Sequence, residues 1–272
     1  NVCWRNAILW RKTNKRNEGL LMKVITLGSG SKGNCALVLS ENSAILIDAG
    51  ITYRLVEKNL ENINLSFNNI DGILITHCHK DHTAHLKTII KNTKINAYIP
   101  KKMYESIRDL IPIERCIFIN DDFNINDFKI KLIHTSHDAP SSVGYIIESN
   151  NKKMMYVTDT GYLNRKYVLP CTNLDIYLIE SNHDESMLMN GPYPHFLKAR
   201  VIGDEGHLSN IQTAKFLKKV VGNKTKIIML LHLSEKNNNQ ELAYNTVTKE
   251  LNTQQIQVLI AKQDEESPLL EV

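Results

Sequence analysis

Three histidines and one aspartate lie within six residues, directly after a short apolar run. Residues 73–82 read ILITHCHKDH, which places these side chains at His77, His79, Asp81 and His82. Side chains two apart on an extended chain point to the same side, so His77 and His79 can bind one metal ion together. Asp81 and His82 fall on the turn into the next helix, from where they can reach a second ion. Imidazole and carboxylate groups are the ligands of hydrolytic metal centres, so the segment predicts such a centre.

A second motif, near the start, has the spacing of a dinucleotide-binding loop. Residues 28–33 read GSGSKG and satisfy GxGxxG. That motif binds a pyrophosphate only when its third glycine opens a helix. The residues that follow, 35–40, are typical of a strand, so we expect a tight turn between two strands. Ser29, Ser31 and the backbone amides of this turn can line a phosphate-binding rim.

The elements that must position these residues alternate along the chain. Short runs rich in Val, Ile and Leu predict strands at 23–27, 36–39, 44–47, 72–75, 96–99, 116–119, 128–133, 143–148, 153–157, 175–179, 226–231 and 255–260. Helical spacing predicts helices at 53–62, 84–91, 103–109, 211–221 and 241–251. The early strands follow one another without helices, which favours mixed sheets. We therefore expect a single α/β domain over residues 22–272, with two sheets face to face and helices outside, in a four-layer αββα sandwich.

The HxHxDH pattern of residues 77–82 resembles the first signature of the metallo-β-lactamase superfamily, and the likeness extends over residues 22–272. The resemblance implies the αββα fold and a dinuclear metal centre. It implies seven ligands in all: His77, His79, Asp81, His82, His137, Asp159 and His232. One ion would be held by His77, His79 and His137, and the second by Asp81, His82 and His232, with Asp159 as the bridge. Taken singly, His137 and His232 are ordinary histidines at strand ends.

The chemistry of such a centre is hydrolytic. Two divalent ions about 3.5–4 Å apart share a water and lower its pKa, so a bridging hydroxide becomes the nucleophile at neutral pH. The ligand set suits Zn²⁺, Mn²⁺ or Fe²⁺ and does not choose among them. Oxygen-reducing di-iron relatives are expected to carry Glu at the position of His79, so hydrolysis is favoured over redox chemistry. Asp81 is expected to belong to the catalytic group as well as to the ligands.

Two further segments resemble the phosphodiesterase branch of the superfamily, which includes tRNA 3′-processing enzymes. Glu180 follows the strand expected at 175–179, and His207 stands just before the helix expected at 211–221. By the resemblance, Glu180 orients His207, which contacts the scissile phosphate or protonates the departing oxygen. On the residues alone, Glu180 is a solvated acid at a strand end and His207 a histidine without a ligand.

A closer likeness concerns one family within this superfamily. GSGSKGN at residues 28–34, ESNHD at 180–184, GPYP at 191–194 and GHLSN at 206–210 are together similar to the YycJ family, also called WalJ or VicX. This resemblance implies a bacterial cytoplasmic nuclease that degrades DNA in the 5′→3′ direction, with a place in DNA repair. The candidate substrate contacts are Ser29, Ser31, His183, Lys198, Arg200 and Ser209. On composition alone, the two cations among them are a solvated helix face.

The net charge does not by itself indicate a nucleic-acid partner. The chain has a formal net charge of +4, but residues 1–21 hold five basic residues against Glu18 alone, so residues 22–272 balance to zero. Any phosphate-binding surface must then be local. We interpret residues 1–21 as a non-native or disordered N-terminal extension, with translation starting at Met22, where a strand-like pattern begins. A genuine basic tail is the alternative.

Cysteine usage and hydropathy bear on the cellular compartment. The five cysteines are scattered and form no CxxC pair, which indicates reduced thiols in a cytoplasmic protein. The longest apolar runs have strand length only, well below the roughly 20 residues that cross a bilayer, so we expect no membrane partner. Nothing in the pattern indicates the oligomeric state.

Three interpretations of the function stay open. A metal-dependent nuclease acting on DNA ends is favoured by the pair Glu180 and His207. A small-molecule hydrolase for a lactone, thioester or cyclic phosphodiester is mildly favoured by the neutral charge, and an RNA-processing nuclease is a further alternative. A non-catalytic binding module is disfavoured, because every expected metal position holds a competent ligand.

Overall fold

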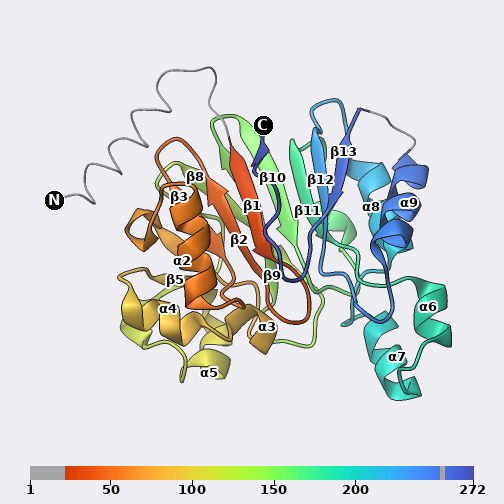
Figure 1. Ribbon diagram of the computed structural model, residues 1–272, viewed down its shortest axis with the longest axis horizontal. Helices are drawn as coiled ribbons and strands as arrows, with labels where there is room; N and C mark the ends of the chain where they lie inside the picture. Colours follow the sequence, from red (N-terminus) through yellow and green to blue (C-terminus); the bar gives the residue numbers. More distant parts are fainter. Residues whose placement is uncertain (1–21, 252–254) are drawn as a thin grey trace.

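Two seven-stranded sheets form the centre of the described part of the chain (Figure 1). The computed structural model describes residues 22–251 and 255–272, so the interpretation of residues 1–21 lies outside the described residues. The first sheet has the order β14 (Leu270–Glu271), β1 (Lys23–Gly28), β2 (Cys35–Leu39), β3 (Ala44–Ile47), β4 (Gly72–Leu74), β5 (Ala97–Pro100) and β6 (Cys116–Ile119). The second has the order β13 (Gln257–Ile260), β12 (Ile227–Leu231), β11 (Ile176–Glu180), β10 (Lys152–Val157), β9 (Val143–Ser149), β8 (Phe128–His134) and β7 (Phe123–Ile125).

Helices cover the outer face of each sheet (Figure 1). The first sheet is covered by α2 (Tyr53–Asn62), α4 (Leu86–Asn92) and α5 (Tyr104–Ile107), and the second by α8 (Asn210–Val220) and α9 (Gln240–Leu251). The connections hold α3 (Lys80–Thr83), α6 (Glu185–Asn190), α7 (His195–Ile202) and the 3₁₀ turns η2 (Phe67–Asn69), η3 (Lys101–Met103), η4 (Ile113–Arg115) and η5 (Arg165–Tyr167). Among the described residues, every helix is too short or too polar to cross a lipid bilayer.

Three apolar cores separate the four layers. Successive side chains of a strand point to opposite faces, so neighbours in one strand enter different cores. Ile45 lies between the two sheets, whereas Leu46 packs under the helices of the first sheet. In the second sheet, Leu178 lies between the sheets and Ile179 packs under its helices. Because both faces of each sheet are covered, the central strands are apolar along their whole length.

The strand directions bring several loops to one edge of each sheet. β3 to β6 run parallel to one another, as do β10 to β13. Loops that leave the carboxyl ends of parallel strands lie at the same edge, which is where open α/β sheets bind ligands. Polar residues follow these ends: Asp48 after β3, Asp159 after β10 and His232 after β12, with Glu180 as the last residue of β11.

The predicted αββα sandwich in a single domain is confirmed, and the elements that were not predicted are short. β7 and β14 have three and two residues, too few to show a period of two. They form because β8 and β1 pair with them. The helices α3, α6 and α7 were also missed. α7 lacks an apolar stripe facing the core, because Phe196 and Ile202 are exposed, so its sequence carries no helical periodicity.

Tyr145 links the two sheets and provides a test of their packing. This fully buried residue of β9 donates its hydroxyl to the carbonyl of Ile75, just after β4, at 2.7 Å. Tyr145→Phe leaves that buried carbonyl without this donor, so we expect urea denaturation to show a loss of about 1–3 kcal/mol in the free energy of unfolding. Tyr53→Phe is the control, because its partly exposed hydroxyl bonds to Glu57, and it should cost less than about 0.5 kcal/mol. An unchanged stability of Tyr145→Phe would contradict this role.

Candidate metal centre

The seven predicted metal ligands meet at the edge where the two sheets send out their loops. His77 and His79 lie between β4 and α3, and Asp81 and His82 lie in α3. The other three follow strands of the second sheet: His137 after β8, Asp159 after β10 and His232 after β12. These side chains form overlapping groups in which the candidate ligand atoms lie within 4.8 Å of one another. Segments far apart in the sequence therefore converge on one small volume.

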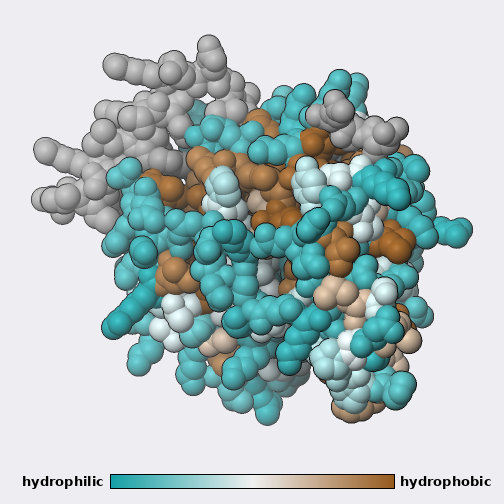
Figure 2. Space-filling model, turned by 45° about the vertical axis from the view of Figure 1, so that its right-hand side comes forward, coloured by the Kyte–Doolittle hydropathy of each residue, from teal (hydrophilic) through white to brown (hydrophobic). Residues whose placement is uncertain are grey.

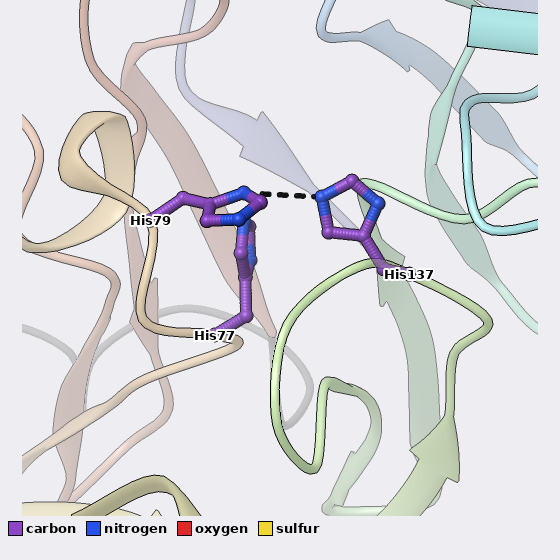
Figure 3. A group of neighbouring side chains, drawn as sticks. All are labelled: His77, His79 and His137. Atoms are coloured by element: carbon purple, nitrogen blue, oxygen red, sulfur yellow. Dashed lines mark hydrogen bonds between the residues drawn. The ribbon is translucent and has the colours of Figure 1, made fainter. Parts of the chain in front are cut away.

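The first group consists of three imidazoles. His77, His79 and His137 form a nearly equilateral triangle, with ring centroids 4.8, 4.9 and 5.0 Å apart. In Figure 3, His77 and His79 come from one segment and His137 approaches from a loop on the opposite side. His79 Nδ1 lies 3.2 Å from His137 Nε2. Three imidazoles on one side of an ion, with the other side open, are typical of a catalytic zinc-type site.

The second group consists of Asp81, His82 and His232, and one Asp81 oxygen lies near both histidines. Asp81 Oδ2 lies 3.4 Å from His82 Nε2 and 3.4 Å from His232 Nε2. Asp159 lies between the two groups: its Oδ2 is 3.1 Å from His82 Nε2, and its Oδ1 is 4.0 Å from His137 Nε2. A carboxylate in this position can bridge two ions.

The backbone at three positions around the centre has an uncommon conformation. Asp48, Asp159 and His232 have φ values of 64°, 54° and 55°. A residue other than glycine in this left-handed region costs on the order of 1–3 kcal/mol, and such residues cluster at functional sites. Each of the three lies just beyond a strand. The bend turns its side chain away from the strand axis and toward the centre.

Hydrogen bonds to the outer nitrogens fix the tautomers of two histidines. His82 Nδ1 lies 2.7 Å from Asp48 Oδ2, and His137 Nδ1 lies 3.1 Å from the carbonyl oxygen of Glu205. A carboxylate and a carbonyl can only accept, so each Nδ1 carries the proton. In the neutral form of each histidine, the lone pair of Nε2 is then available to a metal ion, although Asn34 Nδ2 lies 2.9 Å from His82 Nε2 in this structure.

Unpaired buried atoms show that the centre fits metal ions. Among the described residues, His77 Nε2, His232 Nε2 and Asp159 Oδ2 are buried and have no hydrogen-bond partner. Roughly nine in ten buried polar groups have a partner, so three such atoms in one cluster need an explanation. All three are ligand atoms of the predicted set, and divalent cations would satisfy them together.

The electrostatics of the cluster also favour positive charge. Burial opposes the charged form of His232, but Asp159 and Asp81 outweigh it and raise the pKa of His232 to about 10. Burial likewise acts against His82, yet the Asp48 carboxylate raises the pKa of His82 well above its ordinary value. Burial alone would raise the pKa of Asp159, but the positive charges of the two histidines lower it well below its usual range. The centre therefore attracts cations, either protons or metal ions.

Glu180 is fully buried and organises two histidines. Its Oε1 accepts from His207 Nδ1 at 2.7 Å and from His232 Nδ1 at 3.0 Å. Its Oε2 accepts from the backbone N–H groups of Thr160 and Leu208, both at 3.1 Å. Burial raises the pKa of Glu180, but the charge of His207 outweighs it and lowers the pKa to about 2. With four donors bound, the ionised carboxylate positions these histidines and has no lone pair directed at an ion.

His207 stands beside the centre with one ring nitrogen bound to Glu180. Its Nδ1 is bound to Glu180, so Nε2 is the atom left to meet a substrate. The side chain is 20% exposed and lines a cavity that lies over the centre. Burial disfavours its charged form, but the Glu180 carboxylate prevails and raises the pKa of His207. The arrangement suits a proton donor.

The cavity over the centre has a volume of about 330 Å³. Its floor is formed by the centre itself, and two walls rise from the α7 side and from the loop after β12. The lining residues beyond the floor include Ser31, Tyr193, Leu197, Arg200, Val201, Leu233, Ser234, Glu235, Lys236 and Asn237. This volume is at the lower end of the roughly 300–1,000 Å³ of small-ligand sites, so the cavity is large enough for a small molecule.

The predicted substrate contacts fall into two sets. Ser31 and Arg200 line the cavity. Ser29 is buried, and its hydroxyl accepts from the backbone N–H of His232 at 2.9 Å, so it holds a candidate ligand in place. The ammonium of Lys198 donates a hydrogen bond to the carbonyl of Met189 at 2.7 Å, and this bond ties α7 to the end of α6.

His183 and Ser209 lie behind the cavity wall. Neither belongs to the lining residues of the cavity in the described chain. His183 is 1% exposed, and its Nδ1 has no hydrogen-bond partner among the described residues. Ser209 caps α8: its hydroxyl accepts from the N–H of Gln212 at 3.2 Å and donates to Glu185 at 2.9 Å. The role observed for Ser209 is thus structural.

Several residues of the site were missed from the sequence. Asp48 follows a predicted strand, so the rule about carboxyl ends of strands could have identified it. Asp138 adjoins His137 and forms an ion pair with Arg200 at 2.7 Å. Tyr193 belongs to the GPYP segment, whose role was not predicted, and Lys236 carries no motif. Only the fold brings these two to the cavity.

Comparison with known proteins agrees with the geometry of the site. Residues 43–233 match the family described as Beta-lactamase superfamily domain. The chain is 33% identical over 230 residues to "Exodeoxyribonuclease YycJ" of Bacillus anthracis, covering 83% of this chain and 87% of that protein. It is 33% identical over 236 residues to "Exodeoxyribonuclease WalJ" of Streptococcus pneumoniae, covering 84% of this chain and 88% of the relative.

A solved structure shares the fold. The metallo-β-lactamase fold protein YhfI from Bacillus subtilis superposes with a TM-score of 0.71 at 16% identity, covering 93% of this chain and 100% of that one. At this level of identity the likeness concerns the fold alone. The family match and the two relatives go further: the chain belongs to the β-lactamase superfamily and, within it, to the YycJ/WalJ family.

Proposed function

We propose that this protein is a metal-dependent phosphodiesterase that degrades DNA from its ends as a 5′→3′ exonuclease. The observation that carries the proposal is the His207–Glu180 pair, in which His207 Nδ1 lies 2.7 Å from Glu180 Oε1. The pair stands beside a centre in which three candidate ligand atoms have no hydrogen bond within the described chain. The relatives named exodeoxyribonuclease support DNA as the substrate. A cytoplasmic location and a place in DNA repair are part of the same proposal and rest on the family likeness.

Two divalent ions complete the proposed site. His77, His79 and His137 would hold one ion, Asp81, His82 and His232 the other, and Asp159 would bridge them. Zn²⁺, Mn²⁺ and Fe²⁺ all fit this donor set. When bound, the pair would lower the pKa of a shared water and polarise the phosphate.

The residues around the centre handle the proton and the phosphate. His207 donates a proton from Nε2 to the departing oxygen, while Glu180 holds Nδ1–H and stabilises the imidazolium before transfer. Arg200 lines the same cavity and offers a cation to the phosphate. Ser29 and Asp48 act indirectly, because each holds a histidine of the centre.

A small-molecule hydrolase is the second candidate, and the cavity volume of about 330 Å³ favours it, since a lactone or cyclic phosphodiester fits there. An RNA-processing nuclease uses the same chemistry as a DNase. These alternatives differ from the proposal in substrate and share its centre.

Loss of one metal ligand tests the proposed activity. Protein loaded with Mn²⁺ should shorten linear DNA stepwise from the 5′ end, as followed by denaturing gels. His79→Ala should slow this by about 100-fold or more, because losing even an indirect partner of a metal ligand costs about 10–100-fold. His134→Ala is the matched control, because His134 is exposed and lies outside the cavity. Intact DNA together with cleavage of RNA or a lactone would refute the DNase assignment.

The proposed acid role of His207 predicts a dependence on the leaving group. His207→Ala should lower the rate of DNA cleavage by about 10²–10⁴-fold, the usual contribution of a general acid. Bis(p-nitrophenyl) phosphate releases a stable anion that needs no proton, so its hydrolysis should fall by less than about 10-fold. Glu180→Gln should slow hydrolysis of both substrates, because Glu180 also holds the candidate ligand His232. Equal losses on both substrates in His207→Ala would mean that His207 acts on binding or folding and not as the acid.

Exchange of protons for metal ions predicts a pH effect on stability. The pKa of His232 is about 10 in the metal-free protein and roughly 6.5 when unfolded. Because the pKa of His232 is higher in the folded protein, protonation of His232 stabilises the fold. This stabilisation is complete below about pH 6.5 and is lost as the pH rises toward 10. The Tm of chelator-treated protein should therefore fall between about pH 6.5 and 9, and metal loading should reduce that fall. A Tm of the metal-free protein that rises over this window would contradict the account.

A further inference from the structure

The GPYP segment, residues 191–194, forms the turn between α6 and α7 and presents Tyr193 to the cavity. α6 and α7 protrude beside the second sheet (Figure 1). Figure 2 shows a mainly hydrophilic face with paler and apolar surface at its lower right, over the part of the molecule that these helices form. The proposed mechanism leaves this turn without a role.

The turn is held in a defined conformation. Tyr193 stands between Pro192 and Pro194, so its own backbone and that of its neighbours are restricted. A side chain at position 191 would come within 2.6 Å of the Met187 carbonyl, which explains the glycine there. The backbone N–H of Asp184 donates to the Asn237 carbonyl at 2.8 Å, which ties the start of α6 to the opposite cavity wall. A backbone restricted in this way reduces the entropy that the turn loses when a ligand binds.

The cavity lining contains both apolar and charged side chains, Glu235 among the charged ones. Tyr193, Leu197 and Val201 contribute apolar lining on the α7 side. Leu197 and Val201 lie one helical turn apart on α7. Arg200 on the same side and Lys236 on the opposite wall contribute cations. Asp138 holds the guanidinium of Arg200 at 2.7 Å, so the cation keeps its place at the rim of the centre. An apolar face beside two cations matches a ligand that carries both a flat ring and phosphate groups.

We propose that Tyr193 and Leu197 form a nucleobase subsite, which receives the base of the terminal nucleotide of a single strand. This inference rests on the proposed nuclease function. The base stacks on Tyr193, while Arg200 and Lys236 contact the flanking phosphates and the scissile phosphate lies over the centre. A volume of about 330 Å³ is large enough for one nucleotide. Stacking on an aromatic ring is tolerant of sequence, so the subsite recognises any base.

Abasic substrates test the subsite. Two single-stranded oligonucleotides differ only in whether the terminal nucleotide carries its base or an abasic tetrahydrofuran, and kcat/KM is measured on each. The wild-type protein should prefer the base-bearing strand by about 5- to 150-fold, the range that stacking of one base provides. An abasic residue placed well inside the strand should have no effect. Tyr193→Ala should bring kcat/KM on the base-bearing strand close to the abasic value, and Tyr193→Phe should restore the preference.

Phe196→Ala is the control, because Phe196 lies on α7, is 76% exposed and does not line the cavity in the described chain. It should keep the preference of the wild type. Equal kcat/KM on the two strands in the wild type, or equal losses on both strands in Tyr193→Ala, would overturn the subsite while leaving the nuclease function intact. Absence of cleavage of either strand by the wild type would instead refute the nuclease function and the subsite with it.

Discussion

Buried negative charge is the constraint on which the site depends. Asp48, Asp159 and Glu180 are almost fully buried within one cluster, and buried carboxylates are costly unless donors or cations match them. Asp48 has His82, and Glu180 has four donors. Within the described chain, Asp159 Oδ2 has no hydrogen bond, and the same is true of His77 Nε2 and His232 Nε2 in the same cluster. The protein thus neutralises its outer carboxylates with its own groups and leaves the central one for cations.

The fold meets this constraint by placing strand ends and the short helix α3 around the centre. Each sheet contributes loops from the carboxyl ends of parallel strands, and left-handed residues at Asp48, Asp159 and His232 turn the side chains inward. The sheets are covered on both faces, so their strands are rigid supports. Glu180 then couples the two functions of the site, since one oxygen holds both a candidate ligand, His232, and the candidate acid, His207.

The sequence was sufficient for the sandwich and for the cluster of residues 77–82, because apolar periodicity and close spacing are local properties. The other candidate ligands were predicted through a family resemblance, since no local pattern relates His137 to His232. Lys198 and Arg200 show the limit: both are cations on one helix, yet one ties α7 to α6 and the other lines the cavity. Their difference depends on the direction of each side chain. The path of the GPYP turn depends likewise on contacts with the loop after β12, which no local pattern encodes.

The most direct test of the account is the number of metal ions that each chain binds. Purified protein would be saturated with Zn²⁺ or Mn²⁺, desalted and analysed for metal by mass spectrometry against protein concentration. We expect two ions per chain in the wild type, and one or none in Asp159→Ala, whose bridging carboxylate is gone. Saturation of the wild type at one ion or fewer, or an unchanged content in Asp159→Ala, would contradict a dinuclear centre built around this residue.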